Sequence, residues 1–517
     1  MAEPDGSFRL LGNSAWNAAA FVIGVGLNLV ILPFVVFRLG LAAFGVAGLV
    51  TACLAPALAF SNALAISTAR ELAHRLTTAE RDDARRFFAT ALLLAVGIGG
   101  LIVIGFGVAG PPLARLAFHL SGESANDLGL AFALGAVGWL CQCLSAVFLA
   151  LFTARQDYRR ISLISITSAV VATGSMAVLI PSWPQASTVL GCQALGFATG
   201  LLVVVVLSRM RLGEWLASPA LHRGPLGDLV TVGSWQLAAH GGGLLSGQVD
   251  RYLLGALLQP QFVGFYTIAQ RLEEAMYIGI LKVGEILFPY FGALQRESSE
   301  RKAELLFRSS WILNVLAASA LGALVPVASP LLYLWTGPDV AAEAQRVLVV
   351  LAIAGMLGCS ANVFAFYLLA HGQSRSIALI SLVTAVFTVA TSAIALPYFG
   401  WQAAGWSACA GMIAQIVTTI LLLRRSFSIA GIWSRVAHFV LLPLGTGIAT
   451  ALALRYALRD ALFDHVPHWW YVGGLYCLAA GIIFIVVVTA SRIGPHGAVC
   501  WQDLRVIASR FLPVRAT

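Results

Sequence analysis

The sequence predicts an all-α membrane protein with about fourteen transmembrane helices, and three observations indicate this class. Of its 517 residues, 59% are hydrophobic and only 11% are charged, whereas soluble domains are about 25% charged. Apolar stretches recur along the whole chain, each close to the roughly 20 residues that a helical crossing needs. The alternating pattern of a membrane barrel is absent from the sequence. The composition therefore excludes a large soluble enzyme.

The predicted crossings follow these apolar stretches in chain order. The first is longer than the apolar core of a signal peptide and no cleavage pattern follows it, so we expect it to remain a membrane span. Short polar or basic loops separate the others. The fourteen stretches are 13–37, 43–65, 88–110, 129–153, 161–180, 188–208, 230–257, 264–291, 309–334, 346–370, 377–396, 402–423, 436–456 and 471–490.

The positive charges predict which side of the membrane each loop occupies. With the N-terminus placed in the cytoplasm, 24 of the 32 lysines and arginines fall on the cytoplasmic side, five fall outside and three lie within crossings. Such a bias orients helical membrane proteins. We therefore expect both termini to be cytoplasmic. Anionic lipid headgroups on that face would balance the net charge of +9, so nucleic acid is not an expected partner.

An internal repeat divides the first twelve crossings into two halves. The segment 161–165 returns at 377–381, an offset of 216, and Pro181 is matched by Pro397 at the same offset. A second repeated motif lies around the loops before the second and eighth crossings. It pairs Leu39-Gly40 and Phe44-Gly45 with Leu254-Gly255 and Val263-Gly264.

The repeat predicts the organisation of the chain. Six crossings are an even number, so the two halves have the same orientation and are related by an axis along the membrane normal, as in two-lobed transporters. Apolar residues on one helical face of the tail favour a helix on the inner membrane surface. We predict a first lobe at 1–208, a cytoplasmic linker at 209–229, a second lobe at 230–425, two extra helices at 426–490 and an amphipathic cytoplasmic tail at 491–517.

A charged stripe in the eighth crossing gives the strongest functional signal. Arg271, Glu274, Lys282 and Glu285 are spaced by three, eight and three positions, so they share one helical face. Glu273 lies one position off it. Charges at membrane depth usually face a bundle interior or a water-filled cavity. The cations can contact an anionic substrate, and the carboxylates can pair with them or bind a coupling ion; structural ion pairing is the alternative.

Further polar residues extend this candidate site. The seventh crossing ends with Gln248, Asp250 and Arg251. It also contains Gln236 and His240, followed by three glycines that lower helix propensity and favour a bend. Candidates in the first two crossings are Asn17 and, near the inner end, Arg70. Amides suit sugar hydroxyls, although they also join helices to one another. A hydrogen-bonded histidine is the simpler interpretation of His240, and a proton relay is the alternative.

The motifs of several enzyme classes are missing from the sequence. Neither of its two lysines lies in the Gly-Lys-Ser/Thr context of a nucleotide-binding loop, and no histidine begins a His-Glu-x-x-His zinc motif. The cysteines have no metal-site spacing and are interpreted as small buried hydrophobic residues. We therefore expect no catalytic residue, metal or cofactor, and predict a transporter driven by an ion or substrate gradient.

Several short motifs resemble those of one transporter family. The beginning of the chain contains Asn13-Ser14-Ala15-Trp16, then Phe37-Arg38-Leu39-Gly40 and Phe44-Gly45. The middle contains Asp250-Arg251-Tyr252-Leu253-Leu254-Gly255, then Val263-Gly264-Phe265-Tyr266 and Arg271-Leu272. Phe288-Pro289, 396–400 and 403–405 continue the pattern. Over nearly its full length, the chain resembles the polysaccharide-exporting flippases of the multidrug/oligosaccharidyl-lipid/polysaccharide exporter superfamily.

The resemblance implies two six-helix lobes, two extra helices and a cavity lined by the first, second, seventh and eighth crossings. It implies flipping of an undecaprenyl-diphosphate-linked oligosaccharide from the inner to the outer leaflet of a bacterial inner membrane, for exopolysaccharide synthesis with polymerase or assembly proteins as partners. Cations would hold the diphosphate. The first two crossings lack the mid-membrane arginines that lipid II flippases tend to carry. Lipid II flipping, cation-coupled multidrug efflux and, in another class, a membrane glycan polymerase or ligase are the alternatives.

Overall fold

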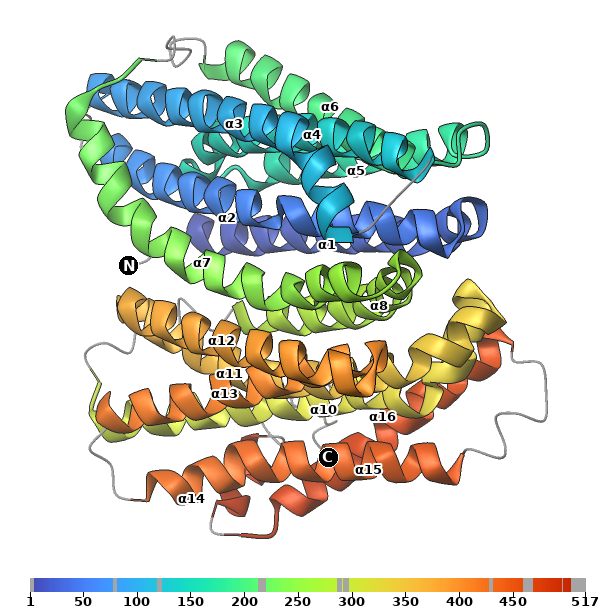
Figure 1. Cartoon of the computed structure of the whole chain (residues 1–517). Helices are drawn as coiled ribbons and strands as arrows, with labels where there is room; N and C mark the ends of the chain where they lie inside the picture. The colour runs from blue at the N-terminus through green and yellow to red at the C-terminus, as the bar shows by residue number, and fades with distance from the viewer. Residues whose placement is uncertain are drawn as a thin grey trace. The chain divides into compact units, whose positions relative to one another are not determined.

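The computed structural model describes the chain as helical throughout, with no strand among the residues described (Figure 1). These residues are 4–77, 81–118, 123–212, 220–285, 291, 297–426, 431–458, 468–494 and 496–503. The helices of the first half are α1 (Pro4–Leu39), α2 (Leu41–Thr77), α3 (Arg81–Phe118), α4 (Glu123–Ala154), α5 (Tyr158–Leu179), α6 (Ala186–Leu212), α7 (Arg223–Leu257) and α8 (Pro260–Glu285). Those of the second half are α10 (Ser299–Thr336), α11 (Pro338–Ala370), α12 (Ser374–Phe399), α13 (Ala404–Ser426), α14 (Ile432–Val436), α15 (Leu442–Ala457) and α16 (Trp469–Ser491).

The predicted all-helical membrane class is confirmed. In the described part of the chain, twelve segments are long and apolar enough to cross a membrane. Helices α7 and α8 are not among these twelve, but they occupy the positions of the seventh and eighth predicted crossings. Helix α8 carries the charged stripe, which lowers its hydropathy. The expected count of about fourteen therefore agrees with the observed helices.

Local sequence signals explain where several helices begin and end. The Asp157 carboxylate accepts a hydrogen bond from the Arg160 backbone N–H at the start of α5. The Ser298 hydroxyl accepts one from the Arg301 backbone N–H at the start of α10. Such side chains satisfy N–H groups that have no partner within the helix. Gly337 ends α10 with a φ of 100°, a conformation that glycine adopts without a steric penalty.

The chain divides into two compact units, Met1–Thr267 and Ile268–Thr517, so the division falls within α8. In the first unit, α2, α3 and α4 enclose an apolar core in which Phe88 and Phe148 make an edge-to-face contact. Helix α7 and the first two turns of α8 also belong to this unit. The predicted lobe boundary at 209–229 stays a prediction.

Helix α10 is the central element of the second unit and is buried along most of its length. The indole N–H of Trp311 donates to the Ser491 hydroxyl on α16 at 3.0 Å. Further along, the Tyr476 hydroxyl of α16 donates to the Ala320 carbonyl at 3.0 Å. The Arg455 guanidinium of α15 donates to the Val325 carbonyl at 3.0 Å. Hydrogen bonds at several positions along α10 therefore hold the two extra crossings, which contain α15 and α16, against it.

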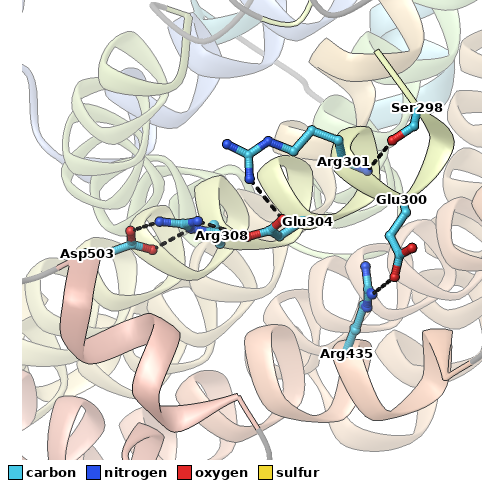
Figure 2. Close-up of polar contacts among 7 residues, drawn as sticks. All are labelled: Ser298, Glu300, Arg301, Glu304, Arg308, Arg435 and Asp503. Atoms are coloured by element: carbon cyan, nitrogen blue, oxygen red, sulfur yellow. Dashed lines mark hydrogen bonds and ion pairs between the residues drawn. The ribbon is translucent and has the colours of Figure 1, made fainter.

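Ion pairs join the beginning of α10 to later parts of the second unit (Figure 2). Arg308 binds both Glu304, one turn earlier, and Asp503, which lies in a helical segment at 497–503. Arg435 binds Glu300 at 3.4 Å. Residues 504–517, which contain most of the predicted apolar face of the tail, lie outside the described residues.

The internal repeat has a counterpart in the packing of each unit. In the first unit, Gly200 of α6 packs against the Ser168 hydroxyl of α5 so closely that an added methyl group would overlap it. In the second unit, Gly411 of α13 packs in the same way against the Thr388 hydroxyl of α12. The side chain of Thr384, which lies 216 positions after Ser168, also borders Gly411. Both halves therefore pack their fifth and sixth crossings through glycine and a hydroxyl residue.

Candidate functional site

The charged stripe of α8 begins with an ion pair. One guanidinium nitrogen of Arg271 lies 3.3 Å from a carboxylate oxygen of Glu274, one turn along the helix. The two side chains are 43% and 39% exposed. This is the i,i+3 pairing that the sequence permits. An exposed guanidinium retains donors for a second anionic group, because its five N–H groups exceed what one carboxylate binds.

Only part of the remaining stripe can be placed. Lys282 is partly exposed, while the side chain of Glu285 lies outside the described residues. The predicted partnership of these two residues therefore stays a prediction.

Glu273 points to a different face of α8 from the stripe. Its carboxylate lies against Gly355 of α11, where an added methyl group would overlap one of its oxygens. One turn later, Tyr277 lies against Gly358, and a methyl group there would be 3.1 Å from the tyrosine hydroxyl. The two glycines of α11 therefore make the space in which the polar groups of α8 fit.

Asn362 completes this polar cluster in the second unit. Its amide nitrogen donates to the Tyr277 hydroxyl at 2.5 Å and to the Gly358 carbonyl at 2.9 Å. Sequence reasoning missed Gly355, Gly358 and Asn362, although their spacing of three and four places them on one helical face. A carboxylate beside a hydrogen-bonded phenol has the donors and acceptors to exchange a proton or to bind a small cation.

The charged residues at the end of α7 are enclosed in the first unit. Asp250 and Arg251 are each 2% exposed. The Tyr266 hydroxyl of α8 donates to the Asp250 carboxylate at 2.9 Å. The Arg251 guanidinium donates to the Gln248 amide oxygen at 3.0 Å. The expected roles of Arg251 and Gln248 as substrate contacts stay predictions, and they require a state in which these groups become exposed.

The other predicted residues are placed less fully. Asn17 on α1 and Arg70 on α2 have exposed side chains. The side chains of Gln236 and His240 lie outside the described residues, although their backbone belongs to α7. Helix α7 is continuous through Gly241–Gly243, and Figure 1 shows it curving along its length. The glycines therefore accompany curvature rather than a break.

Within the described part of the chain, no three histidine, cysteine, aspartate or glutamate residues form a group that could hold a metal ion. All eight cysteines are free thiols, and only Cys477 is exposed.

Comparisons with known proteins place these features in context. A family model described as "Polysaccharide biosynthesis protein" matches residues 10–295. No curated protein matches the sequence. Among solved structures, a "Lipid II flippase MurJ, inward closed conformation" is 10% identical with a TM-score of 0.68, covering 96% of this chain and 100% of that one.

Two transporters of the MOP superfamily are also similar. An inward-facing multidrug resistance MATE family transporter is 16% identical with a TM-score of 0.67, covering 79% of this chain and 94% of that one. A transporter from Pyrococcus furiosus, whose binding pocket is described as reversed in polarity, is 15% identical with a TM-score of 0.62. That likeness covers 81% of this chain and 96% of that one. At these identities the likenesses establish the fold.

Proposed function

The chain belongs to the polysaccharide biosynthesis protein family, and on that premise we propose that it flips an undecaprenyl-diphosphate-linked oligosaccharide from the cytoplasmic to the periplasmic leaflet. The observation that carries the proposal is the exposed guanidinium of Arg271 within the predicted eighth crossing. A charge at this depth is expensive unless it serves a pathway. The planar fork of arginine suits the oxygens of a diphosphate.

The substrate's chemistry suggests a division of labour among the predicted residues. Arg271 and Lys282 would bind the diphosphate, joined by Arg251 and Arg70 in states that bring them to the pathway. Amides such as Asn17, Gln236 and Gln248 would bind sugar hydroxyls. The prenyl chain would remain in the lipid, because transferring its many apolar carbons into a polar pathway would lose the favourable energy of burial.

Glu273 is the residue we propose for coupling transport to an ion gradient. Its carboxylate lies in the polar cluster with Tyr277 and Asn362 rather than in the exposed pair of the stripe. Binding a proton or sodium ion there would neutralise a negative charge packed against α11 and so favour one packing of α8 on α11 over another. Glu274, Glu285, Asp250 and His240 are the other candidates for coupling or charge pairing.

Two alternatives are favoured by specific observations. Multidrug efflux is favoured by the fold shared with MATE transporters, and lipid II flipping by the match to MurJ over 96% of this chain. Both alternatives are transport functions of proteins that share this fold. The absence of mid-membrane arginines from the first two crossings favours the oligosaccharide substrate over lipid II. A glycan polymerase or ligase, the remaining alternative, has no supporting observation.

The proposed location is a bacterial inner membrane with both termini in the cytoplasm. Arginine outnumbers lysine by 30 to two, which is the compositional basis for a bacterial source. Lipids and polysaccharide polymerase or assembly proteins are the proposed partners.

A deletion strain separates these functions. The strain is complemented with the native chain, with Arg271→Ala or with Arg301→Ala. Surface glycan is then stained and drug susceptibility is measured in each complemented strain and in the deletion strain itself. Arg301 lies in a comparably exposed ion pair outside the predicted crossings, so it controls for the loss of a surface cation. We expect Arg271→Ala alone to lose surface glycan while still reaching the membrane. Normal glycan together with raised drug susceptibility in the deletion strain would instead establish efflux.

A further inference from the structure

Two connections that the repeat relates meet in the first unit. Helix α1 is followed by α2, and α7 is followed by α8, and both connections lie on the predicted outer side. At their meeting point α2 and the first two turns of α8 approach through backbone atoms. A methyl group added to Gly45 would overlap the carbonyl oxygen of Pro260. One added to Gly264 would lie 2.7 Å from the carbonyl oxygen of Leu41.

The two approaches are reciprocal. Gly264 lies 219 positions after Gly45, and Pro260 lies 219 positions after Leu41. Each repeat therefore presents a glycine to the carbonyl that the other repeat presents in return. This is the pattern of an isologous contact, in which the same patch is used on both sides of a two-fold axis. The glycines belong to the motif that the sequence repeats, Phe44-Gly45 and Val263-Gly264.

The contact continues along α2 on a single helical face. Gly48, one turn after Gly45, faces Thr267, and a methyl group there would lie 3.1 Å from the threonine hydroxyl. One turn further, the carbonyl of Ala52 accepts a hydrogen bond from the Tyr252 hydroxyl of α7 at 2.5 Å. Leu41, Gly45, Gly48 and Ala52 are spaced by four, three and four residues, so they form one stripe.

This construction suits a contact that opens and closes. Glycines let helix backbones approach closely in a membrane, where packing replaces the hydrophobic effect as the attractive force. At Gly45 and Gly264 the two sides meet through glycines and backbone carbonyls, so the two sides can separate there without displacing a side chain of either glycine. Glycine lowers helix propensity, and three glycines on this short contact face indicate that the close approach itself is needed.

We propose that the reciprocal contact of Gly45 with Pro260 and of Gly264 with Leu41 is an outer gate, which opens to release the substrate outside. The inference rests on the proposed transport function. It predicts two properties. Locking the contact stops transport, and a side chain wedged into it exposes the outer ends of α2 and α8 to water.

A reversible cross-link tests the first property. Gly48→Cys and Thr267→Cys are combined in a full-length chain whose native cysteines are replaced and whose loop after α6 carries a protease site. After cleavage at this site, two halves joined by the disulfide migrate as one band on a gel without reductant. The native contact brings the two side-chain positions within the range of a disulfide. We expect oxidation to link the halves and to lower flipping in vesicles about tenfold or more, with recovery after reduction.

The single-cysteine chains control for oxidation and should flip equally with and without oxidant. If the halves link fully and flipping continues at the unlinked rate, the contact does not need to open and the gate is rejected. Failure of the halves to link would also reject it, because the native contact would then be absent from the membrane.

A wedge tests the second property without any substrate. Leu41→Cys is introduced into the cysteine-free chain, alone or together with Gly45→Leu or Gly279→Leu. Each chain is labelled from outside with a membrane-impermeant maleimide. Gly279 is on α8 and has open space around it. Gly45→Leu should raise the labelling rate several-fold and Gly279→Leu should leave it unchanged. Equal rates in the two chains would contradict the gate.

The two tests separate the gate from the transport function. If Gly45→Leu does not fold, the disulfide pair decides the question alone. If linking and labelling behave as expected in chains that move no lipid-linked oligosaccharide, the gate stands and the substrate assignment fails.

Discussion

Arg308 of α10 and Asp503, near the end of the described chain, form a two-point ion pair across 195 residues. Two guanidinium nitrogens bind the two carboxylate oxygens, and the Nε–Oδ2 distance is 2.8 Å. The third nitrogen donates to Glu304 at 2.9 Å (Figure 2). The Arg308 and Asp503 side chains are 24% and 14% exposed, so solvent screens this pair less than a surface pair.

We expect Asp503→Ala to lower the free energy of unfolding by about 1–3 kcal/mol, because it leaves a partly buried guanidinium with one partner fewer. The matched control is Glu300→Ala, which removes a carboxylate that is 79% exposed from its pair with Arg435. An exposed pair contributes about 0–1 kcal/mol. Thermal unfolding in lipid nanodiscs measures both. Equal effects of the two variants would show that Asp503 does not fasten the tail to α10.

The repeated packing of the fifth and sixth crossings gives a second prediction. Gly411→Leu inserts a side chain where a single methyl group already overlaps the Thr388 hydroxyl. Overpacking of this kind costs about 1–3 kcal/mol. Gly174→Leu on α5 is the control, because nothing lies within 4 Å of that glycine. We expect both Gly411→Leu and the corresponding Gly200→Leu in the first unit to lower the midpoint of thermal unfolding, and Gly174→Leu to leave it unchanged.

Glu273 supplies a prediction about coupling. Glu273→Gln keeps the shape of the side chain but removes its charge, so a site that works by binding a cation should stop responding to the ion gradient. Flipping driven by a pH or sodium gradient should fall roughly tenfold or more, the effect of about 1.4 kcal/mol on a barrier. Glu343→Gln, an exposed carboxylate on α11, is the control. Undiminished gradient dependence in Glu273→Gln would assign coupling to another group.

The space beside Glu273 can be tested separately. Gly355→Leu would overlap its carboxylate and should reproduce the transport loss of Glu273→Gln while the charge remains. Lower gradient-driven flipping by a correctly folded Gly355→Leu protein would show that the position of the carboxylate matters. Normal flipping would show that the α8–α11 cluster is not part of the coupling mechanism.

Much of the fold could be predicted from the sequence because it depends on local properties. Hydropathy located the helices, and helical spacing placed Arg271 and Glu274 one turn apart, where they form an ion pair. The repeat also has a local signature in the sequence, and in each half the fifth and sixth crossings pack through a glycine, Gly200 or Gly411, and a hydroxyl residue. Each of these signals lies within one segment or compares two segments directly.

The rest could not be predicted because it depends on which helix packs against which. No pattern within α8 distinguishes Glu273, which lies against Gly355, from the exposed carboxylate of Glu274. Asp250 is buried and accepts a hydrogen bond from the Tyr266 hydroxyl on the next helix, a contact that no pattern within α7 indicates. Asn362 was missed for the same reason, because its partner Tyr277 lies 85 residues earlier.

Arg271 provides a prediction about substrate binding. Arg271→Lys keeps the charge but loses the two-pronged contact of the guanidinium with diphosphate oxygens. It should therefore weaken binding of a polyprenyl diphosphate less than Arg271→Ala does. Binding to the purified protein can be measured with the diphosphate and with a polyprenyl monophosphate. If the three chains bind equally, Arg271 does not contact the phosphate groups.

The most direct measurement is flipping by the purified protein in vesicles. A fluorescent oligosaccharide linked to undecaprenyl diphosphate is incorporated into both leaflets, and the fraction that becomes accessible to an external glycosidase is followed over time. We expect the native chain to expose the inner pool faster than protein-free vesicles and faster than vesicles containing Arg271→Ala. A native chain that leaves the inner pool protected, in vesicles where it expels a cationic drug, would contradict the proposed function.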